Sequence, residues 1–563
     1  MNIPQKRWVI APAIPPEAEG ALDSYPPIVR QILFNRGFST PEAAQSYLEA
    51  RMPPETDPYL LLGMDIAVDR IRQAIKEREK IAVYGDYDVD GVTATALLVE
   101  TFENLGADVQ GYIPNRFDEG YGLNSEALDS LVEQGVRLVI TVDCGIRSIN
   151  EVEHANKIGL DVIITDHHHP YQELPPALSI LNPKQLADHY AHKDLAGVGL
   201  AYKLAAALFG GDREADTFLD LVALGTVADL APLAGENRSL VRKGIEMIRQ
   251  TRRQGLMALL GASGLESARI TAADIGYILG PRLNAAGRLD SALAALSLLT
   301  TRDTHKAAQL AQFLDNQNRK RQEITREIQQ KAEQIALSRD PDPYLLFAVH
   351  PDFNPGVVGL AASKLVETYY RPAIVAHQGE GFVRGSCRSI PEFHITQALD
   401  QCADLMEHHG GHAAAAGFTI REANLPILFD RLSEIAAEQL AEIDLRHKLY
   451  ADIEVPLAEL RPELLRYLFL MQPTGYGNRQ AHFVSRNLKV TSKRKVGRDG
   501  NHLKLTVTDG RITYDAIAFG LGYWYERMPA KIDLLYSFEL NEFNGRVTLQ
   551  LNIRDIKATS YSN

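Results

Sequence analysis

Cysteine is scarce in this chain of 563 residues, which contains only three. Cys144, Cys387 and Cys402 are far apart and odd in number, and their spacing matches no metal-binding or redox motif. We therefore expect neither disulfides nor a thiolate metal site. This usage is typical of a protein from a reducing compartment.

Long apolar runs and an export signal are also missing. No stretch of the sequence is long and apolar enough to cross a bilayer, and the N-terminal MNIPQKRW lacks the apolar core of a signal peptide. We expect a cytoplasmic protein with no membrane contact. At roughly 100 to 200 residues per domain, the length predicts three or four domains.

The chain has no excess of positive charge, since 72 acidic residues face 59 basic ones and the net charge is −13. This balance argues weakly against a protein that coats nucleic acid, because such binding depends on neutralising phosphates. Basic residues are nevertheless bunched, above all at 486–504, which contains Lys489, Lys493, Arg494, Lys495 and Arg498. A basic channel on an acidic protein is compatible with this pattern.

What the sequence does contain is three acidic clusters, each placed after a short apolar run. GDYDVDG at 85–91 follows an expected strand at 81–84, DCG at 143–145 follows one at 137–142, and DHH at 166–168 follows one at 161–165. In a parallel α/β sheet the carboxyl ends of the strands meet at one edge, so these side chains should converge. Carboxylates with one or two imidazoles suit Mn²⁺ or Mg²⁺.

Other interpretations of these acids are available. A lone aspartate after a strand is more often a helix N-cap than a ligand. Asp86, Asp88 and Asp90, however, alternate in one short segment, and their mutual repulsion is costly unless a cation compensates it or the loop is well solvated. A Ca²⁺ loop is the nearest competitor, yet the EF-hand spacing and its terminal Glu are missing. The coincidence of three clusters favours a two-metal site.

The adjacent histidines, His167 and His168, raise a separate question. In an extended segment neighbouring side chains point to opposite sides, so we expect one imidazole to bind a metal and the other to contact substrate or lie behind the ligands. Asp166 is placed to orient an imidazole by accepting its N–H.

The order of elements predicts several domains. Residues 1–60 should form a packed arm with helices at 21–31 and 41–49. Strands at 81–84, 108–113, 137–142 and 161–165 alternate with helices at 91–105, 124–134 and 148–158, which predicts a parallel, doubly wound α/β domain over 61–302. An uninterrupted helical pattern at 304–339 predicts a connecting helix, 303–340, before a smaller α/β domain at 341–446.

The last part, 447–563, changes to strands of period two with an Asn-Gly turn signal at 544–545, which predicts a small β-barrel. Its basic stretch near 493–502 should form a hairpin or loop. Aromatic residues accompany it, namely Tyr514, Phe519, Tyr523, Trp524 and Tyr525. An OB-type single-strand-binding barrel is one interpretation, and a structural barrel with a solvated charged turn has nearly equal weight.

Taken in order, the segments 85–91, 143–145, 166–168 and 225–230 resemble the four motifs of the DHH phosphoesterase superfamily. PRLNAAGR at 281–288, NPGVVG at 354–359, GSCRS at 385–389, the GGH segment at 410–417 and QPTGYGN at 472–478 resemble segments of its bacterial exonucleases, which also carry a DHHA1-type domain. The likeness covers nearly the whole chain. It implies a parallel catalytic domain, a DHHA1-type second domain and an OB-like barrel.

The resemblance also implies residue roles. Two Mn²⁺ or Mg²⁺ ions would be held by Asp86, Asp88, Asp90, Asp143, His167, His168 and Asp229, and which of the first three bind directly stays open. The 5′ phosphate and DNA backbone would be contacted by Arg282, Asn284, Ser386 and Arg388, with Arg116 as a further candidate. His412 would act in catalysis from a region that closes over the crevice. Cys387 replaces a small non-thiol residue and could make the site sensitive to oxidation.

The implied function is processive 5′-to-3′ hydrolysis of single-stranded DNA to 5′-mononucleotides, in recombination and repair, by a monomer that works with a helicase and a single-strand binding protein. A phosphodiesterase for short oligonucleotides or cyclic dinucleotides is the nearest alternative, but it would not need the barrel. A DNA-holding scaffold is a second, which the complete set of acids disfavours. A family II pyrophosphatase would need only about half this length.

Overall fold

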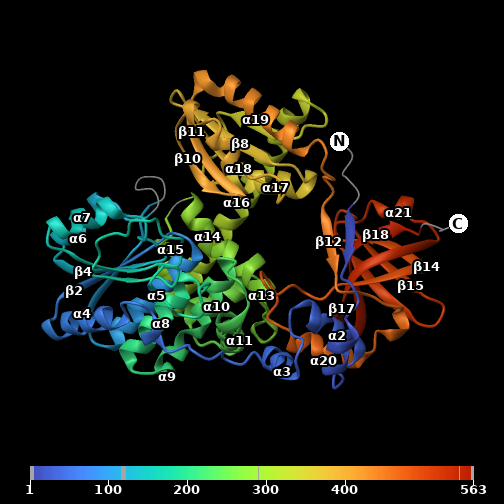
Figure 1. The fold of residues 1–563 in the computed structure, drawn as a ribbon, viewed down its shortest axis with the longest axis horizontal. Coiled ribbons are helices and arrows are strands. Elements are labelled where there is room, and N and C mark those ends of the chain that lie inside the picture. Colours follow the sequence, from blue (N-terminus) through green and yellow to red (C-terminus); the bar gives the residue numbers. More distant parts are fainter. Residues whose placement is uncertain (1–5, 116–121, 290, 544, 560–563) are drawn as a thin grey trace. The chain divides into compact units, whose positions relative to one another are not determined.

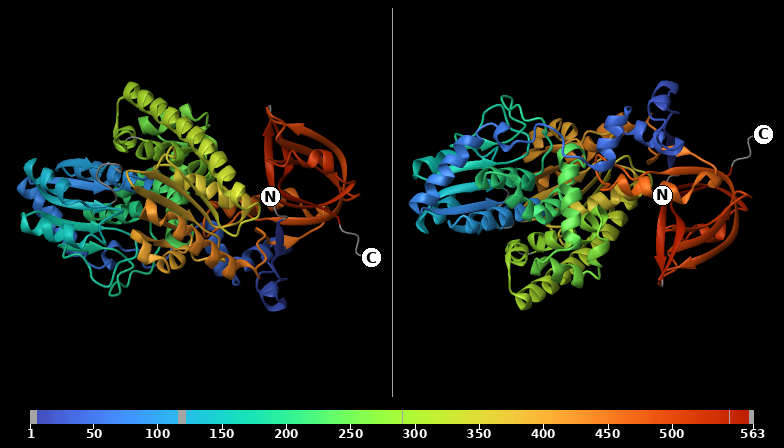
Figure 2. Two further views of the ribbon diagram at one scale, coloured as in Figure 1. Left: turned by 90° about the horizontal axis from the view of Figure 1, so that it is seen from above. Right: turned by 90° about the horizontal axis from the view of Figure 1, so that it is seen from below.

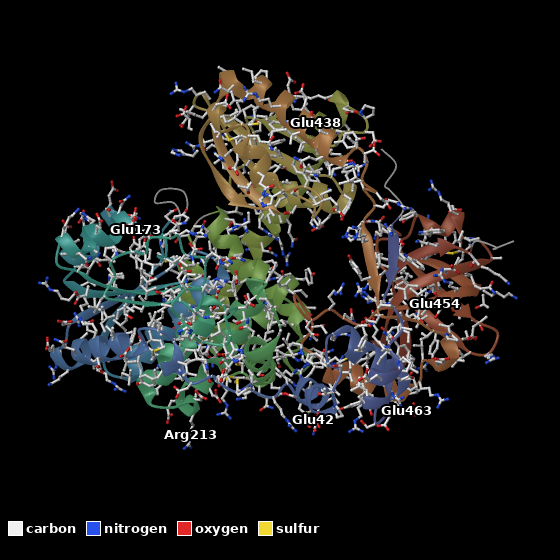
Figure 3. All side chains as sticks on the ribbon, viewed as in Figure 1. Glu42, Glu173, Arg213, Glu438, Glu454 and Glu463 are labelled. Carbon is white, nitrogen blue, oxygen red and sulfur yellow. The ribbon has the colours of Figure 1, made fainter. Side chains whose placement is uncertain are left out.

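The computed structural model describes residues 6–115, 122–289, 291–543 and 545–559 (Figure 1). The chain divides into two compact units. The larger contains Trp8–Gly287, Ser291–Leu314 and Tyr450–Asn563, and the smaller contains Met1–Arg7, Arg288–Asp290 and Asp315–Leu449. Charged side chains such as Glu42, Arg213 and Glu438 lie at the surface of these units (Figure 3). Among the described residues, no helix is both long and apolar enough to span a membrane.

A five-stranded parallel sheet forms the centre of the larger unit, in the order β3-β2-β4-β5-β6. Its strands are β2 (Lys80–Gly85), β3 (Asp108–Tyr112), β4 (Val136–Val142), β5 (Asp161–Thr165) and β6 (Ser179–Leu181). The intervening helices are α5 (Val89–Asn104), α6 (Ser125–Glu133) and α7 (Ile149–Lys157). These elements lie where the sequence predicts them, which confirms a doubly wound α/β domain.

Helices cover both faces of this sheet. Ile81 and Val83 of β2 pack with α4 (Met64–Glu77), α5 and α8 (Gly197–Phe209) on one face. Ala82 and Tyr84 pack with α6 and α7 on the other. Because side chains alternate along a strand, a strand buried on both faces has few charged residues, and β2 has none after Lys80.

Further helices complete this half of the unit. They are α9 (Asp212–Ala215), α10 (Leu219–Ala228), α11 (Gly235–Arg249), α12 (Gln254–Ala262), α13 (Ala272–Asp274), α14 (Gly280–Leu289) and α15 (Leu293–Thr300), with 3₁₀ turns η2 (Asp216–Phe218) and η3 (Ser267–Arg269) and a π-helical turn η4 (Ile275–Leu279). Helix α10 packs against α5, α8 and α11, so its C-terminus reaches the carboxyl edge of the sheet.

The smaller unit contains most of α16 (Thr304–Arg339), a helix of 36 residues that matches the predicted connecting helix. Its sheet has the order β10-β11-β9-β8-β7, with β7 (Leu346–His350), β8 (Ala373–Gly379), β9 (Phe382–Arg388), β10 (Met406–His412) and β11 (Ala415–Arg421). Helix α17 (Val358–Tyr369) packs with α16 on one face, and α18 (Ile395–Asp400) and α19 (Leu425–Leu440) pack on the other. Short 3₁₀ turns are η5 (Ala403–Leu405) and η6 (Glu422–Asn424).

The C-terminal part of the larger unit is a closed barrel (Figure 2). Its strands follow the order β13-β14-β15-β16-β18-β17, and pairing of β14 with β17 closes it. The bounds are β13 (Ile453–Glu454), β14 (Phe483–Val496), β15 (His502–Thr508), β16 (Thr513–Ala518), β17 (Lys531–Phe543) and β18 (Arg546–Ala558), and β12 (Lys448–Ala451), η7 (Leu457–Glu459), α20 (Pro462–Leu470) and α21 (Trp524–Arg527) accompany them. The basic hairpin predicted near 493–502 is the β14–β15 connection.

The N-terminal arm is packed, as the sequence predicts, and the structure places it on this barrel. It contains β1 (Arg7–Ile10), α1 (Pro16–Ala21), α2 (Pro27–Asn35), α3 (Pro41–Glu49) and η1 (Pro58–Leu60), and Val29 and Ile32 of α2 belong to the barrel's apolar core. The single helix predicted at 21–31 is wrong. Proline has no N–H and restricts the residue before it, so Pro26 and Pro27 interrupt the predicted helix and Pro27 begins α2.

Candidate metal centre

Three carboxylates meet at one edge of the parallel sheet because of strand register. The last residues of β2, β4 and β5 lie in one row across the sheet. The next residue after each strand is an aspartate: Asp86, Asp143 and Asp166. All three are buried. The convergence predicted from the sequence is therefore present.

Asp143 lies at the middle of this edge and has an unusual backbone conformation. Its φ is +62°, a left-handed conformation that costs a non-glycine residue about 1–3 kcal/mol, and its N–H donates to the Thr165 carbonyl over 3.0 Å. Gly197 lies directly against it, because a Cβ at Gly197 would stand 2.8 Å from the Asp143 Cβ. Helix α8 thus begins in contact with the acid, and only glycine fits at that point.

The first acidic cluster divides into different roles. Asp88 is the N-cap of α5, and its Oδ1 accepts from the backbone N–H groups of Asp90 and Gly91. Asp90 is fully buried, and its two oxygens accept from Gly197 N at 2.7 Å and Val198 N at 2.8 Å. These α8 donors were not predicted. The only sequence signal for these donors is a Gly-Val-Gly segment at the start of a helix. Such a segment can bind an anion, but it does not indicate which carboxylate lies there.

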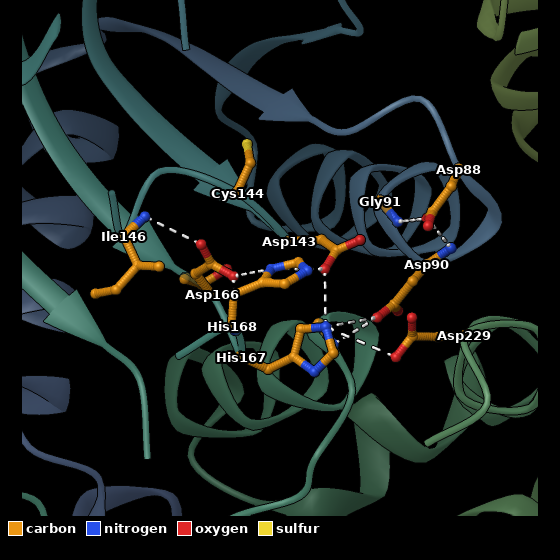
Figure 4. Close-up of polar contacts among 12 residues, drawn as sticks. Asp88, Asp90, Gly91, Asp143, Cys144, Ile146, Asp166, His167, His168 and Asp229 are labelled. Carbon is orange, nitrogen blue, oxygen red and sulfur yellow. Dashed lines mark hydrogen bonds and ion pairs between the residues drawn. The ribbon is translucent and has the colours of Figure 1, made fainter. Parts of the chain in front are cut away.

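Seven side chains lie at this edge closely enough to share divalent ions. Figure 4 shows Asp88, Asp90, Asp143, His167, His168 and Asp229 among them. The seven fall into three overlapping groups with ligand atoms within 4.8 Å of one another: Asp86 with Asp88 and Asp143, Asp90 with His167 and Asp229, and Asp143 with His167 and His168. Asp229 reaches the group from the C-cap of α10. The seven candidate ligands predicted from the sequence are therefore brought together.

Two atoms at the centre of this arrangement are placed to bind a metal ion and do not form a hydrogen bond with each other. The Asp143 Oδ1 and His167 Nε2 atoms are 3.1 Å apart and buried, yet neither has a hydrogen-bond partner within the described ranges. Buried polar atoms are normally paired, so this geometry fits a cation bound by both atoms. An oxygen-rich set with imidazoles suits Mn²⁺ or Mg²⁺.

The expectation that the two histidines point apart is wrong. The ring centroids of His167 and His168 are only 4.7 Å apart, and both rings approach Asp143 Oδ1, at 3.1 and 3.9 Å (Figure 4). Strand β5 ends at Thr165, so the extended geometry behind that prediction does not continue into the pair. Asp166 orients His168 as predicted, with Oδ1 2.7 Å from its Nδ1.

The electrostatics describe a site that needs cations. Burial, followed by the charge of neighbouring aspartates, raises the pKa of Asp90 to about 7, that of Asp229 to about 9, and that of Asp143 well above its usual value. Burial and the charge of His168 lower the pKa of His167 to about 3, which keeps that imidazole neutral and able to bind a metal.

Helix α14 runs beside the metal loop and carries two predicted substrate residues. Asn284 Oδ1 accepts from the Val89 N–H at 3.1 Å and so helps to hold the loop of the first acidic cluster. Arg282 is half-buried, and its Nη1 donates to the Ile278 carbonyl at 2.8 Å. Arg116, the weaker candidate, lies outside the described residues.

The smaller unit contains the remaining candidates, which cluster among themselves. Arg388 Nη1 donates to Ser386 Oγ at 3.0 Å on β9. Arg388 and His412 both face Ala415 of β11 in register, so they lie in one row of the sheet. Gly359 lies so close to the β9 pair that a Cβ would stand 2.8 Å from Ser386 Oγ.

The surroundings of Cys387 favour an unreactive thiol, which the sequence alone left open. Its side chain is fully buried in the apolar core on the opposite side of β9 from Ser386, and burial raises its pKa to about 12. A thiol that stays protonated and inaccessible is inert. All three cysteines are free and buried, in agreement with the absence of disulfides.

The aromatic residues predicted on the barrel have mixed surroundings. Phe519 and Tyr523 are exposed, whereas Tyr514 is buried and its hydroxyl donates to the Leu460 carbonyl. Lys493 and Lys495 lie over the ring of Tyr525, at 4.9 and 5.4 Å.

Known proteins share this architecture. Sequence profiles match at 80–226 (DHH family, N-terminal domain), 342–440 (DHHA1 domain) and 451–555 (RecJ OB domain). The chain is 39% identical to the single-stranded-DNA-specific exonuclease RecJ of Bacillus subtilis (strain 168), over 95% of this chain and 68% of that protein. It is 36% identical to RecJ of Escherichia coli (strain K12), over 94% and 96%.

A solved structure agrees with these matches. RecJ from Thermus thermophilus, crystallised in complex with Mn²⁺, superposes with a TM-score of 0.84 at 30% identity, covering 98% of this chain and 80% of that one. The predicted fold class, with a DHH domain, a DHHA1 domain and an OB-type barrel, is thus confirmed. The chain belongs to the RecJ family of single-stranded-DNA-specific exonucleases, within the DHH phosphoesterase superfamily.

Proposed function

We propose that this protein is an exonuclease that degrades single-stranded DNA from 5′ to 3′ and releases 5′-mononucleotides, using two Mn²⁺ or Mg²⁺ ions. The observation that carries the proposal is the buried pair of Asp143 Oδ1 and His167 Nε2, unbonded at the centre of five carboxylates and two imidazoles. Family membership supports the substrate class.

The roles follow from the positions of the residues. Asp86, Asp88, Asp90, Asp143, His167, His168 and Asp229 would hold the ions. When bound, two divalent ions would lower the pKa of an attacking water and offset charge on the phosphate in the transition state. Asp90 and Asp143 are kept in place by the start of α8, and Asp166 fixes His168, so these ligands need no rearrangement to bind.

Substrate would be positioned by guanidinium and hydroxyl groups. Arg282, Ser386 and Arg388 would bind the 5′ phosphate and the backbone, with Arg116 and Asn284 as further contacts, and His412 would offset charge on the phosphate under attack. Guanidinium groups bind phosphate through paired hydrogen bonds, which gives both charge and orientation.

The cellular setting is part of the proposal. We expect the enzyme to act as a cytoplasmic monomer in recombination and repair, on strands opened by a helicase and covered by a single-strand binding protein. Free 5′ ends would be its point of entry.

A labelled-strand assay tests the activity. Single-stranded DNA carrying a 3′ label is incubated with Mn²⁺, Mg²⁺ or EDTA, beside duplex, RNA and a 5′-blocked strand. The expected result is metal-dependent loss of nucleotides from the 5′ end of the unblocked single strand alone. Cleavage confined to very short oligomers or cyclic dinucleotides, or binding without cleavage, would contradict the proposal.

A further inference from the structure

Two exposed side chains with apolar surface lie at the end of α10 and on the turn packed against it, and the proposed function leaves them unused. Leu230 is 67% exposed, although it follows the largely buried α10, and Tyr277 is 84% exposed between the buried Ile275 and Leu279 of η4. We refer to Leu230 and Tyr277 as the apolar rim. Single exposed apolar residues are ordinary on proteins, so the backbone at these two positions decides whether the rim has a purpose.

Leu230 occupies a position that favours glycine. It directly follows Asp229 at the end of α10, and its φ is +61°. Its N–H donates to the Val227 carbonyl and the N–H of Ala231 donates to the Thr226 carbonyl, at 3.3 and 3.2 Å. This hydrogen-bond pair closes a helix through one left-handed residue, which is usually glycine. A strained, exposed leucine beside a metal-site acid is explained by a use for its side chain rather than by the fold.

Tyr277 lies on an equally unusual element. The π-helical turn η4 is a rare structure that occurs often at functional sites. It lies against the last turn of α10, because Cβ atoms at Gly276 and Gly280 would stand 3.7 Å from Val227 Cγ1 and 3.3 Å from Ala228 Cβ. Ile275 and Leu279 are buried in this packing, while the Tyr277 ring points into solvent.

The same helical path leads from the rim to the metal loop. Arg282 follows Tyr277 by five residues, about 7.5 Å of helical rise, and Asn284 then bonds to the loop at Val89. Tyr277, the proposed phosphate ligand Arg282 and the contact of Asn284 with the metal loop therefore follow one another along one helical segment. A strand whose phosphate lies at Arg282 has its bases free to meet an apolar, aromatic surface nearby.

We propose that Tyr277 stacks on, and Leu230 packs against, a nucleobase of the single strand whose terminal phosphodiester lies at the metal centre. An aromatic face accepts any base, so this contact orients the strand without reading its sequence. The inference rests on the proposed exonuclease activity and deepens it by naming the base-contacting residues.

Enzyme variants and abasic substrates test the stacking contact together. Tyr277→Ala should lower kcat/KM on single-stranded DNA about tenfold, mainly through KM, whereas Tyr277→Phe and Tyr277→Trp should stay within about twofold of wild type. The matched control is Tyr59→Ala, which removes a 51% exposed tyrosine from η1 and should have no effect. In a series of strands with one abasic site each, the Tyr277→Ala defect should vanish at one position. A defect equal at every position, or none at all, would overturn the proposal.

Leu230→Gly separates a functional role from a structural one. Relief of the left-handed strain should raise the thermal unfolding midpoint, while loss of the side chain should lower kcat/KM several-fold. A variant that is more stable and fully active would remove Leu230 from the contact.

A binding measurement keeps the inference distinct from the exonuclease proposal. Strands carrying 2-aminopurine near the 5′ end are bound to Asp143→Asn protein, which leaves the rim intact. Stacking should quench the 2-aminopurine fluorescence at one position, and adding Tyr277→Ala should abolish the quenching. If wild-type protein fails to cleave DNA, the proposed function is wrong. The fluorescence result still shows whether Tyr277 stacks on a base. Equal fluorescence with and without Tyr277 would reject the stacking contact.

Discussion

Asp143 Oδ1 lies 3.1 Å from His167 Nε2, and neither atom finds a hydrogen bond in the part of the chain that the structure describes. The side chain of Asp143 is 2% exposed and that of His167 is 12% exposed. A carboxylate and an imidazole held this way are arranged for a cation between them, and the arrangement costs stability when no cation is present.

Asp143→Asn should therefore separate activity from stability. Loss of the charge should lower nuclease activity by more than about 100-fold, beyond the range expected for a residue behind the ligands. Stability measured in EDTA should rise by on the order of 1 kcal/mol, because like-charge repulsion falls and asparagine tolerates a positive φ. Urea unfolding and single-strand degradation measure the two effects, and a variant that keeps full activity would contradict the assignment.

Metal binding should depend on pH in one direction. In the metal-free protein the pKa of Asp90 is about 7 and that of Asp229 about 9, so both bind protons well above the unfolded value of 3.8. Since metals bind the carboxylates, Mn²⁺ affinity should rise as pH increases from about 6 to 9 and then level off.

The same shifts predict how stability changes with pH. At Asp90 and Asp229 the folded metal-free protein binds more protons than the unfolded chain between about pH 4 and 9, so these two groups should lower its stability as pH rises through this window. The lowered pKa of His167 acts in the opposite direction below its ordinary value of 6.5, so the fall in stability should be clearest between about pH 7 and 9. The thermal unfolding midpoint should be higher in Mn²⁺ than in EDTA, and this difference should grow as pH rises. In Asp229→Asn the difference should change less between pH 7 and 9. An increment that shrinks with rising pH would refute this electrostatic description.

Asp166 acts through His168, and its removal should show this. Asp166→Ala should weaken Mn²⁺ binding about 10- to 100-fold, because the imidazole loses the acceptor that fixes its orientation, and Asp166→Asn, which retains an acceptor, should fall between. Asp129→Ala provides the control, since Asp129 contacts His154 at the same 2.7 Å on the surface. Calorimetry that gives equal affinities for both alanine variants would argue against the role.

Gly197 should tolerate no side chain. A Cβ there would stand 2.8 Å from the Asp143 Cβ, so Gly197→Ala should destabilise the protein by about 1–3 kcal/mol and weaken metal binding. Gly261→Ala in α12 is the matched control, because its Cβ would meet nothing within 4 Å and alanine favours helix. We expect the control to be neutral or slightly stabilising. Wild-type metal affinity in Gly197→Ala would show that α8 does not set the position of Asp143.

The three cysteine thiols should not react with thiol reagents in the folded protein. Cys144, Cys387 and Cys402 are all buried, and burial raises the pKa of each. A thiol reagent should therefore label no cysteine rapidly under native conditions and three after denaturation. Rapid native labelling that also inactivates the enzyme would restore the oxidation-sensitive interpretation of Cys387.

Much of the metal centre could be predicted because the carboxyl ends of parallel strands lie at the same edge of a sheet. Asp86, Asp143 and Asp166 each follow an apolar run, and parallel strands bring their carboxyl ends together whatever lies between them. The long helix α16 was equally predictable, since no proline or glycine interrupts its pattern.

Other features of the site and the fold could not be predicted, because they depend on contacts or local breaks that the sequence pattern does not reveal. The donors to Asp90 come from the start of α8, more than 100 residues away, and only the folded chain brings them together. The orientation of His167 and His168 was missed because a periodicity argument fails once the strand ends. The helix expected at 21–31 failed for a local reason, since Pro26 and Pro27 outweigh the apolar pattern around them.

Diffraction from crystals soaked in Mn²⁺, recorded at the manganese absorption edge, tests the central claim most directly. The account predicts two anomalous peaks, both within bonding distance of Asp143 or its neighbours among Asp86, Asp90, His167 and Asp229. It also predicts that Asp143→Asn crystals lose at least one of them. No peak at this edge of the sheet, or peaks elsewhere with activity intact, would contradict it.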